Sequence, residues 1–257
     1  SEMCIRDSFY GMFGASYDDL FSDNIGHGTG DYTFSQKLKG RIDETKIGSF
    51  GWKKDGVWEN IHDINFMLVN AHKVEGDENE KKHYIGLARL CRALQYYGLI
   101  KNYGSAPWYS APIATDDEEA LYKTQDSRSL VVDSVMADLQ YACDYMQEGS
   151  SRTRVTRYAA LGYMARIALH EGTFRKYHEE ISELAGTVNS FLEKAVWATD
   201  EIMSSGQFEI TGKGAAAYRD LFTNPDLSKN KEMILFSDYD KDLNRKNNTS
   251  TCLLYTS

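Results

Sequence analysis

The sequence contains few prolines and cysteines and no long apolar run. Only three prolines occur in 257 residues, which argues against a turn-rich all-β protein, whereas 17 tyrosines fit long helices with aromatic side chains at their seams. The longest apolar runs, such as residues 233–236, are far shorter than the ~20 residues that a membrane-spanning helix needs. These features predict a mainly helical protein without a spanning segment.

Basic charge is also scarce. The chain has 38 acidic and 29 basic residues, giving a formal net charge of −9, and no local basic stripe interrupts the excess of acid. A phosphate backbone would be repelled by such a surface, so we expect no nucleic-acid partner. The 42% of apolar residues is enough to build a core.

The four cysteines fall into two groups. Cys4 and Cys252 lie near the ends, while Cys91 and Cys143 lie in helical patterns among apolar neighbours. We predict that the inner two are buried free thiols, with a disulfide or metal site as the alternative.

The ends of the chain look unlike natural termini. The opening residues have neither the basic start nor the apolar stretch of a secretory signal, which by itself would indicate the cytoplasm. However, residues 3–8 and 252–257 resemble translated sequencing-adapter sequence. We therefore expect residues 1–8 and 252–257 to be non-native, and residues 9–251 to form a single helical domain that is incomplete at its C-terminal end.

Apolar residues recur at helical spacing along most of the chain. The pattern predicts helices from Trp58, through residues 87–97, from near Ser127, over residues 154–170 and over residues 187–204. Residues 75–82 are expected to form a turn, Thr156 to cap a helix, and residues 208–210 to form a short strand. Pairs of helices at this spacing predict a mainly α fold of tetratricopeptide-like stacked hairpins with long irregular loop insertions.

Four segments, in order, carry a resemblance to a known family. They are Trp58 with the run IHDINFML at 61–68, the run RALQYYGLIKNYGSAPW at 92–108, the run RSLVVDSVMADL at 128–139, and residues 156–178 with the run EGTFRKYH at their end. Together they resemble the N-terminal half of the SusD/RagB family, although His62 stands where many members have arginine.

The resemblance implies a function and a location. Members are outer-membrane lipoproteins of the cell surface that bind oligosaccharides or peptides and pass them to a SusC-like TonB-dependent transporter. The expected ligand is an oligosaccharide or polysaccharide, and the expected membrane contact is a lipid anchor missing from this fragment. A helical-repeat scaffold that binds a partner protein without a small-molecule ligand is the alternative.

Glycan binding requires aromatic faces together with amide and carboxylate groups. Both occur before the first family segment, where we predict ligand contacts from Trp52, Tyr32, Asp31, His27, Asp23 and Asn24. Second choices are Trp108, Tyr109 and Tyr122. The alternative for each aromatic residue is that it anchors its loop on the helices, and the helical aromatics Trp58, Tyr96, Tyr97, Tyr158 and Trp197 are expected in the core or at seams.

Signals for catalysis are weak. The His-Glu pairs at 170–171 and 178–179 could suggest a zinc protease. Each pair lacks the second histidine, four residues after the first, that a zinc-protease helix requires. The glycines at 26–30 follow no apolar strand and precede no Lys-Ser or Lys-Thr pair, and the acidic run at 116–119 is typical of a solvated surface. We therefore expect no catalytic residue, no metal site and no cofactor; a helical carbohydrate-active enzyme is the opposing hypothesis.

Overall fold

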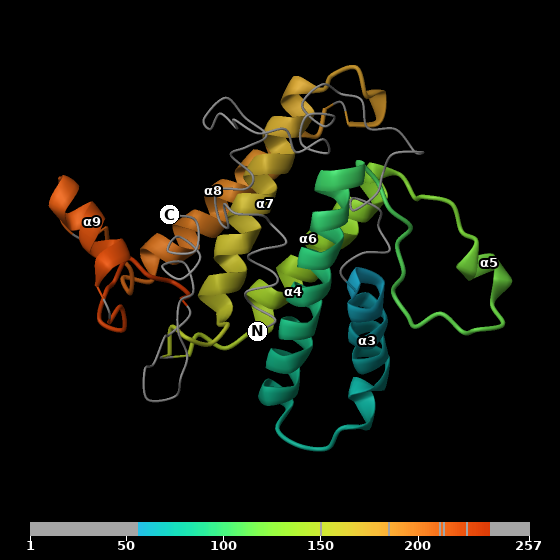
Figure 1. The fold of residues 1–257 in the computed structure, drawn as a ribbon, viewed down its shortest axis with the longest axis horizontal. Coiled ribbons are helices and arrows are strands. Elements are labelled where there is room, and N and C mark those ends of the chain that lie inside the picture. The colour runs from blue at the N-terminus through green and yellow to red at the C-terminus, as the bar shows by residue number, and fades with distance from the viewer. Residues whose placement is uncertain are drawn as a thin grey trace, which may run out of the picture. The chain divides into compact units, whose positions relative to one another are not determined.

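The computed structural model describes residues 56–149, 151–184, 186–210, 212, 214–224 and 226–236. In these residues the elements are α3 (Val57–Asn70), η5 (Ala71–Lys73), α4 (Glu78–Tyr103), α5 (Glu118–Leu121), α6 (Arg128–Tyr145), α7 (Arg157–Tyr177), η6 (Ser182–Leu184), α8 (Val188–Ser204) and α9 (Ala215–Thr223) (Figure 1). The described part of the chain is helical and contains no strand.

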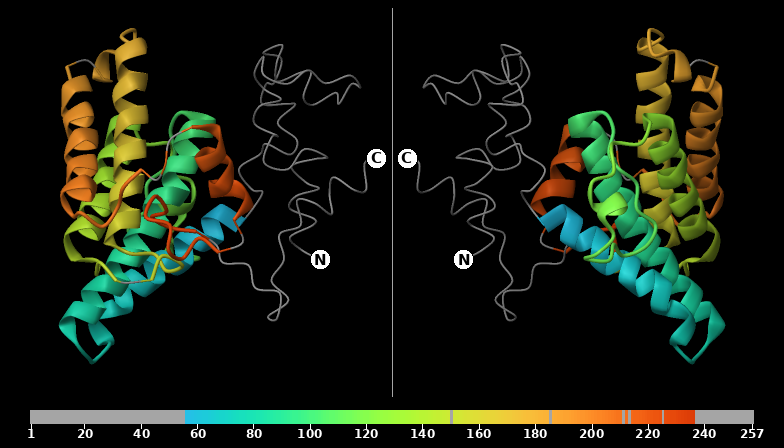
Figure 2. Two further views of the ribbon diagram at one scale, coloured as in Figure 1. Left: turned by 90° about the vertical axis from the view of Figure 1, so that its left-hand side faces the viewer. Right: turned by 90° about the vertical axis from the view of Figure 1, so that its right-hand side faces the viewer.

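The long helices stack in the order of the chain. α3 packs on α4, α4 on α6, α6 on α7, and α7 on α8, so each helix lies mainly against its neighbours in sequence. The helices lie side by side in the two side views (Figure 2), and Figure 1 shows α5 on the long connection between α4 and α6. The predicted fold of tetratricopeptide-like stacked hairpins is therefore confirmed.

Short polar caps determine where two of these helices begin. The Asp77 carboxylate accepts hydrogen bonds of 2.9 Å from the N–H groups of both Asn79 and Glu80, so α4 begins at Glu78. The prediction that residues 75–82 form a turn was therefore wrong for its second half. α6 begins at Arg128, next to the predicted start near Ser127, and the Leu130 N–H donates to the Ser127 hydroxyl. Thr156 was predicted to cap the next helix, but its side chain accepts no hydrogen bond at the start of α7.

Small residues allow the helices to approach closely. A Cβ added at Gly172 of α7 would lie 2.7 Å from Cδ2 of Leu192 in α8. A Cβ added at Gly86 of α4 would lie 2.7 Å from Cγ of Met146, just after α6. Because these two glycines have no side chain, the neighbouring residues can pack directly against the helix backbone at each seam.

The core is formed by one face of each long helix, and it corrects one prediction. Tyr96 and Tyr158 are buried as expected, and Cys143 is a buried free thiol whose pKa burial raises to about 12. Cys91 is also a free thiol, but it is exposed, because the buried face of α4 passes through Leu90 and Ala93 on either side of it.

The predicted strand at 208–210 is absent. Its backbone is irregular, and the Glu209 N–H donates to the Lys231 carbonyl over 3.3 Å without a ladder of further bonds. Phe208 instead packs edge-on against Tyr158, with ring centroids 5.0 Å apart. Phe208 is therefore held against the first turn of α7 by ring packing and not by pairing in a sheet.

Candidate functional site

The residues predicted to bind ligand are not among those the structure describes. Trp52, Tyr32, Asp31, His27, Asp23 and Asn24 lie outside the described residues, as do residues 1–8 and 252–257. Their roles remain predictions. The second choices, Trp108, Tyr109 and Tyr122, all lie on the connection between α4 and α6, which we call the 104–127 loop.

Aromatic packing anchors the base of the 104–127 loop. The rings of Tyr96 and Trp108 lie 4.3 Å apart between centroids, and Trp58 packs edge-on against both Tyr96 and Tyr109 at 6.3 and 6.2 Å. The Tyr109 N–H donates to the Tyr96 hydroxyl over 2.8 Å, and burial raises the pKa of Tyr96. Trp108 and Tyr109 therefore anchor the loop on the helices, which was the alternative considered for them.

A buried ion pair supports this aromatic cluster. Nε and Nη2 of Arg92 donate to the two carboxylate oxygens of Asp138 over 2.7 and 2.8 Å, and both side chains are buried. Nη1 of Arg92 donates to the Asn65 amide oxygen over 2.8 Å, and the Asn65 amide donates to the Tyr109 carbonyl over 2.9 Å. The network joins α3, α4, α6 and the loop.

A second buried cluster fastens the loop's ends to α7. Glu171 accepts hydrogen bonds from Arg128 (2.7 Å) and Arg175 (2.9 Å), and all three side chains are buried. Nη1 of Arg128 also donates to the carbonyl of Gly104 over 3.1 Å. Phe174 covers the Arg128 guanidinium, with 3.9 Å from Cζ to the ring centroid. The cluster fixes the points where α4 ends and α6 begins.

Sequence reasoning missed these two clusters. Asn65, Arg92, Asp138, Arg128 and Glu171 appeared in it as parts of motif segments, without individual roles. The pairs Arg92–Asp138, Arg92–Asn65 and Arg128–Glu171 join residues more than 20 positions apart, so helical periodicity gave no signal for them. The available hints were the four-residue spacing of Glu171 and Arg175 on α7 and the charged residues within otherwise apolar helix faces.

Polar contacts hold the outer part of the 104–127 loop in place. Asp126 accepts a 2.7 Å hydrogen bond from the Trp108 N–H and forms an ion pair with Lys123. Desolvation would raise the pKa of Asp126, but Lys123 and the Trp108 N–H outweigh it, so the pKa lies below its usual value. The Tyr109 hydroxyl donates to the Ala120 carbonyl over 2.7 Å, which secures α5.

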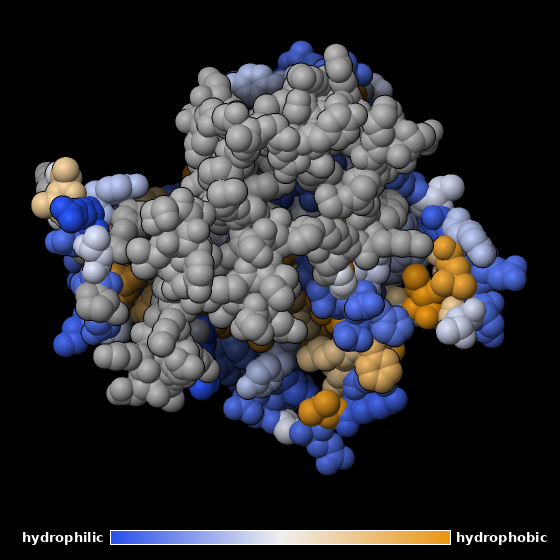
Figure 3. Space-filling model, in the orientation of Figure 1, coloured by the Kyte–Doolittle hydropathy of each residue, from blue (hydrophilic) through white to orange (hydrophobic). Residues whose placement is uncertain are grey.

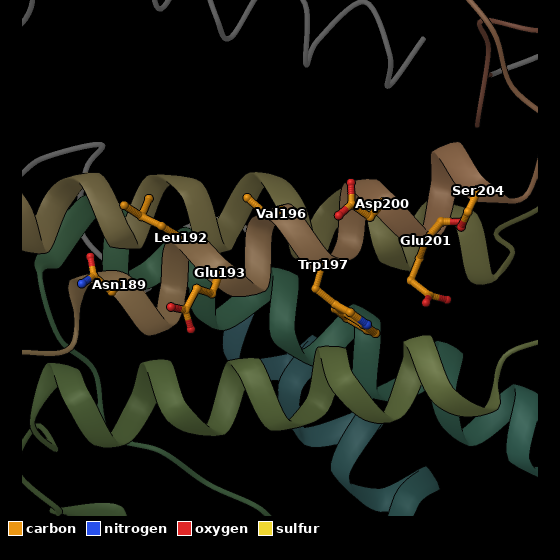
Figure 4. A pocket seen from close by; sticks show the side chains of 8 residues that line it. All are labelled: Asn189, Leu192, Glu193, Val196, Trp197, Asp200, Glu201 and Ser204. Atoms are coloured by element: carbon orange, nitrogen blue, oxygen red, sulfur yellow. The ribbon is translucent and has the colours of Figure 1, made fainter.

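A groove lies along α8 at the end of the described helical row. It has a volume of about 560 Å³ and is lined by Asn189, Leu192, Glu193, Val196, Trp197, Asp200, Glu201 and Ser204. Asn189, Glu193, Trp197 and Glu201 point to the same side of the helix (Figure 4). Trp197 is half-buried, and the Lys194 ammonium lies 5.2 Å from its ring centroid.

The groove's charges are partly neutralised within the chain. Nη2 of Arg157 binds the Glu201 carboxylate over 2.7 Å, and Nζ of Lys194 donates to Gln140 over 2.8 Å. Glu193 and Asp200 remain exposed. The groove therefore combines aromatic, apolar and carboxylate groups on α8, and its carboxylates are exposed or only partly buried.

The described residues contain neither a metal cluster nor a membrane-spanning helix. Within them, no group of three or more His, Cys, Asp or Glu side chains is close enough to hold a metal ion. No helix among the same residues combines the length and the apolar character that crossing a bilayer demands.

Comparison with known proteins gives consistent matches. A family model described as starch-binding associating with outer membrane matches residues 29–169, which include α3, α4, α6 and part of α7. SusD-like protein P2 of Formosa agariphila is 31% identical over 122 residues, covering 47% of this chain and 24% of that protein. SusD-like protein P25 of the same organism is 24% identical over 254 residues, covering 93% of this chain and 42% of that protein.

A solved structure shares the fold. A laminarin binding SusD-like protein superimposes with a TM-score of 0.59 at 18% sequence identity, over 82% of this chain and 42% of that one. The chain thus spans less than half the length of these relatives. Because the family model matches more than half of the sequence, the chain belongs to the SusD-like (SusD/RagB) family, described as starch-binding and associating with the outer membrane.

Proposed function

We propose that this chain is the helical part of a cell-surface protein that captures oligosaccharides and delivers them to a SusC-like TonB-dependent transporter. A lipid anchor would hold the protein at the outer membrane. The family match over residues 29–169 is the observation that carries the proposal.

The matched region contains candidate ligand-binding residues and the helices that position the 104–127 loop. It includes Asp31, Tyr32 and Trp52, and it includes the helices that fix the 104–127 loop. Flat aromatic faces suit the apolar side of pyranose rings, and carboxylate and amide groups suit their hydroxyls. We assign ligand contact to Trp52 and Tyr32 first, with Asp31, His27, Asp23 and Asn24 as polar partners.

Binding can be tested with the intact protein by affinity electrophoresis in gels that contain soluble neutral polysaccharides. We expect retardation by at least one polysaccharide and its loss in Trp52→Ala and Tyr32→Ala. Tyr177→Ala, which changes an exposed tyrosine at the end of α7, serves as the control and should keep full retardation. If no polysaccharide retards the protein but peptides bind, the cargo assigned here is wrong.

Delivery can be tested separately. The intact protein should co-purify with a SusC-like transporter when the outer membrane is solubilised in mild detergent. A protein that binds glycan without any association with the transporter would remove the delivery step and leave capture. Release of reducing ends from a bound polysaccharide would instead support the opposing hypothesis of an enzyme.

A further inference from the structure

The groove along α8 combines the side-chain types that bind carbohydrate. Its volume of about 560 Å³ falls within the range of ordinary small-molecule sites. Trp197, Leu192 and Val196 supply apolar surface, and Asn189 and Ser204 supply an amide and a hydroxyl at its two ends (Figure 4). By contrast, the exposed apolar residues near α5 form a small group among hydrophilic ones (Figure 3), a scattered pattern that needs no partner.

Trp197 is held in place in the middle of the groove. The Lys194 ammonium lies over its ring, 5.2 Å from the centroid, and donates to the Gln140 amide oxygen of α6 over 2.8 Å. The ring is half-buried, so part of its surface remains for a ligand. An aromatic group fixed in this way loses little conformational freedom on binding, which favours affinity.

Two carboxylates lie on either side of Trp197 along the helix. Glu193 and Asp200 are exposed, and neither forms a hydrogen bond or an ion pair with the described residues. Ionised carboxylates accept short, strong hydrogen bonds from hydroxyl groups, which sugars supply. A partner helix laid along α8 by its apolar face would desolvate both charges without pairing them, which is costly. The lining therefore favours a sugar over a helix.

The charge of the groove separates neutral from anionic sugars. Of its three carboxylates, only Glu201 is paired within the described part of the chain, with Arg157 over 2.7 Å. A sugar that carries a carboxylate or a sulfate group would be repelled by Glu193 and Asp200. The lining therefore suits neutral sugars.

We infer that the α8 groove is a second glycan-binding site, apart in sequence from residues 23–52, and that it takes neutral oligosaccharides; this inference rests on the proposed function. A pyranose ring packs on Trp197, and its hydroxyls donate to Glu193 and Asp200. At ~1.5 Å per residue, positions 189–204 extend over about 22 Å, so neighbouring sugar units reach Asn189 and Ser204.

The aromatic contact is tested by affinity electrophoresis of the intact protein in gels that contain soluble starch or laminarin. Two sites act together on one polysaccharide chain, so we expect Trp197→Ala to weaken binding about tenfold without abolishing it. Trp197→Phe keeps a flat aromatic face and should retain most of the binding. Tyr177→Ala, at an exposed tyrosine outside the groove, should bind as the wild type does.

The carboxylates are tested by charge reversal. E193K/D200K should weaken retardation by the neutral polysaccharides and should gain retardation by polygalacturonate, which carries carboxylates, or by dextran sulfate, which carries sulfates. E179K/E183K makes the same change in net charge at exposed positions outside the groove and should match the wild type in every gel. Because Glu193 and Asp200 are exposed, this variant keeps the test valid even if Trp197→Ala fails to fold.

The outcomes separate this inference from the proposed function. If both groove variants match the wild type in every gel, the second site is overturned, while loss of binding in Trp52→Ala still supports the proposed function. If the wild type itself binds no neutral polysaccharide, glycan capture and the second site both fall. If E179K/E183K gains the same retardation as E193K/D200K, net charge explains the effect and the selection by Glu193 and Asp200 is wrong.

Discussion

The Arg92 guanidinium meets the Asp138 carboxylate through two hydrogen bonds of 2.7 and 2.8 Å, between helices α4 and α6. The two residues lie 46 positions apart and both are buried. Because Arg92 also binds Asn65, which holds the Tyr109 carbonyl, a charge pair inside the helical stack positions a loop at its surface.

Asp138→Ala should destabilise the protein by about 3–5 kcal/mol, because it leaves the Arg92 guanidinium buried without its counter-ion. The free energy of unfolding, measured by urea denaturation, checks this. Glu148→Ala, which removes an exposed carboxylate 3.8 Å from Arg157, is the control and should cost less than about 1 kcal/mol. Equal effects of the two substitutions would contradict the role given to the pair.

Glu171→Ala should be more destabilising than Glu171→Gln. The alanine leaves Arg128 and Arg175 buried without the carboxylate that they share, whereas the glutamine keeps one oxygen for a hydrogen bond. Glu201→Gln, at the more exposed pair with Arg157, should change the free energy of unfolding by less than about 1 kcal/mol. Thermal and urea unfolding rank the three variants by their free energy of unfolding. A Glu201→Gln variant as unstable as Glu171→Ala would contradict the importance given to the buried cluster.

Helical periodicity predicted the long helices well but misplaced the buried face of α4. Cys91 was predicted to be buried, whereas the structure exposes it and buries Arg92 beside Leu90 and Ala93. An arginine counts as a surface residue in any hydropathy pattern, and the cost of burying Arg92 is offset by its distant partners Asp138 and Asn65. The pattern therefore fails where a long-range ion pair decides which face turns inward.

The site was harder to predict than the fold. Tyr109 was considered both as a ligand contact and as an anchor, and its anchoring contacts come from Tyr96 and Trp58, on two different helices. Exposure of the acidic run at 116–119 was predicted correctly from its charge. The contacts at the base of the 104–127 loop come from residues on different helices, which no local sequence pattern encodes.

Gly172→Ala should destabilise the protein by about 1–3 kcal/mol through overpacking of the α7–α8 seam. The new Cβ would lie 2.7 Å from Cδ2 and 3.0 Å from Cγ of Leu192, and this clash outweighs the better helix propensity of alanine. Leu192→Ala in the same chain should recover part of the loss, which a double-mutant cycle measures as a coupling between the two sites.

Gly162→Ala is the matched control in the same helix. Nothing lies within 4 Å of a Cβ at this position, so the substitution should stabilise the protein by up to about 1 kcal/mol. A Gly162 variant as unstable as the Gly172 variant would indicate that α7 tolerates no added side chain, and the seam argument would then be wrong.

The Asp126 contacts should make the 104–127 loop sensitive to acid. The pKa of Asp126 is lower in the folded protein, so its carboxylate contributes stability above its unfolded value near 3.8, and this contribution disappears as pH falls through the folded pKa. Asp126→Asn should therefore be less stable than the wild type at pH 6, and the difference should shrink towards pH 2. A constant difference across that range would rule out the carboxylate charge as its cause.

Thiol reactivity should separate the two inner cysteines. Cys143 is buried and its pKa is raised to about 12, so almost no thiolate forms at pH 8, and reagents cannot reach the sulfur. Cys91 is exposed, although partial desolvation raises its pKa and slows the reaction. Iodoacetamide labelling followed by peptide mass spectrometry should modify Cys91 in the folded protein and Cys143 only after denaturation. Early labelling of Cys143 would mean that the packing of α6 on α7 opens in the native state.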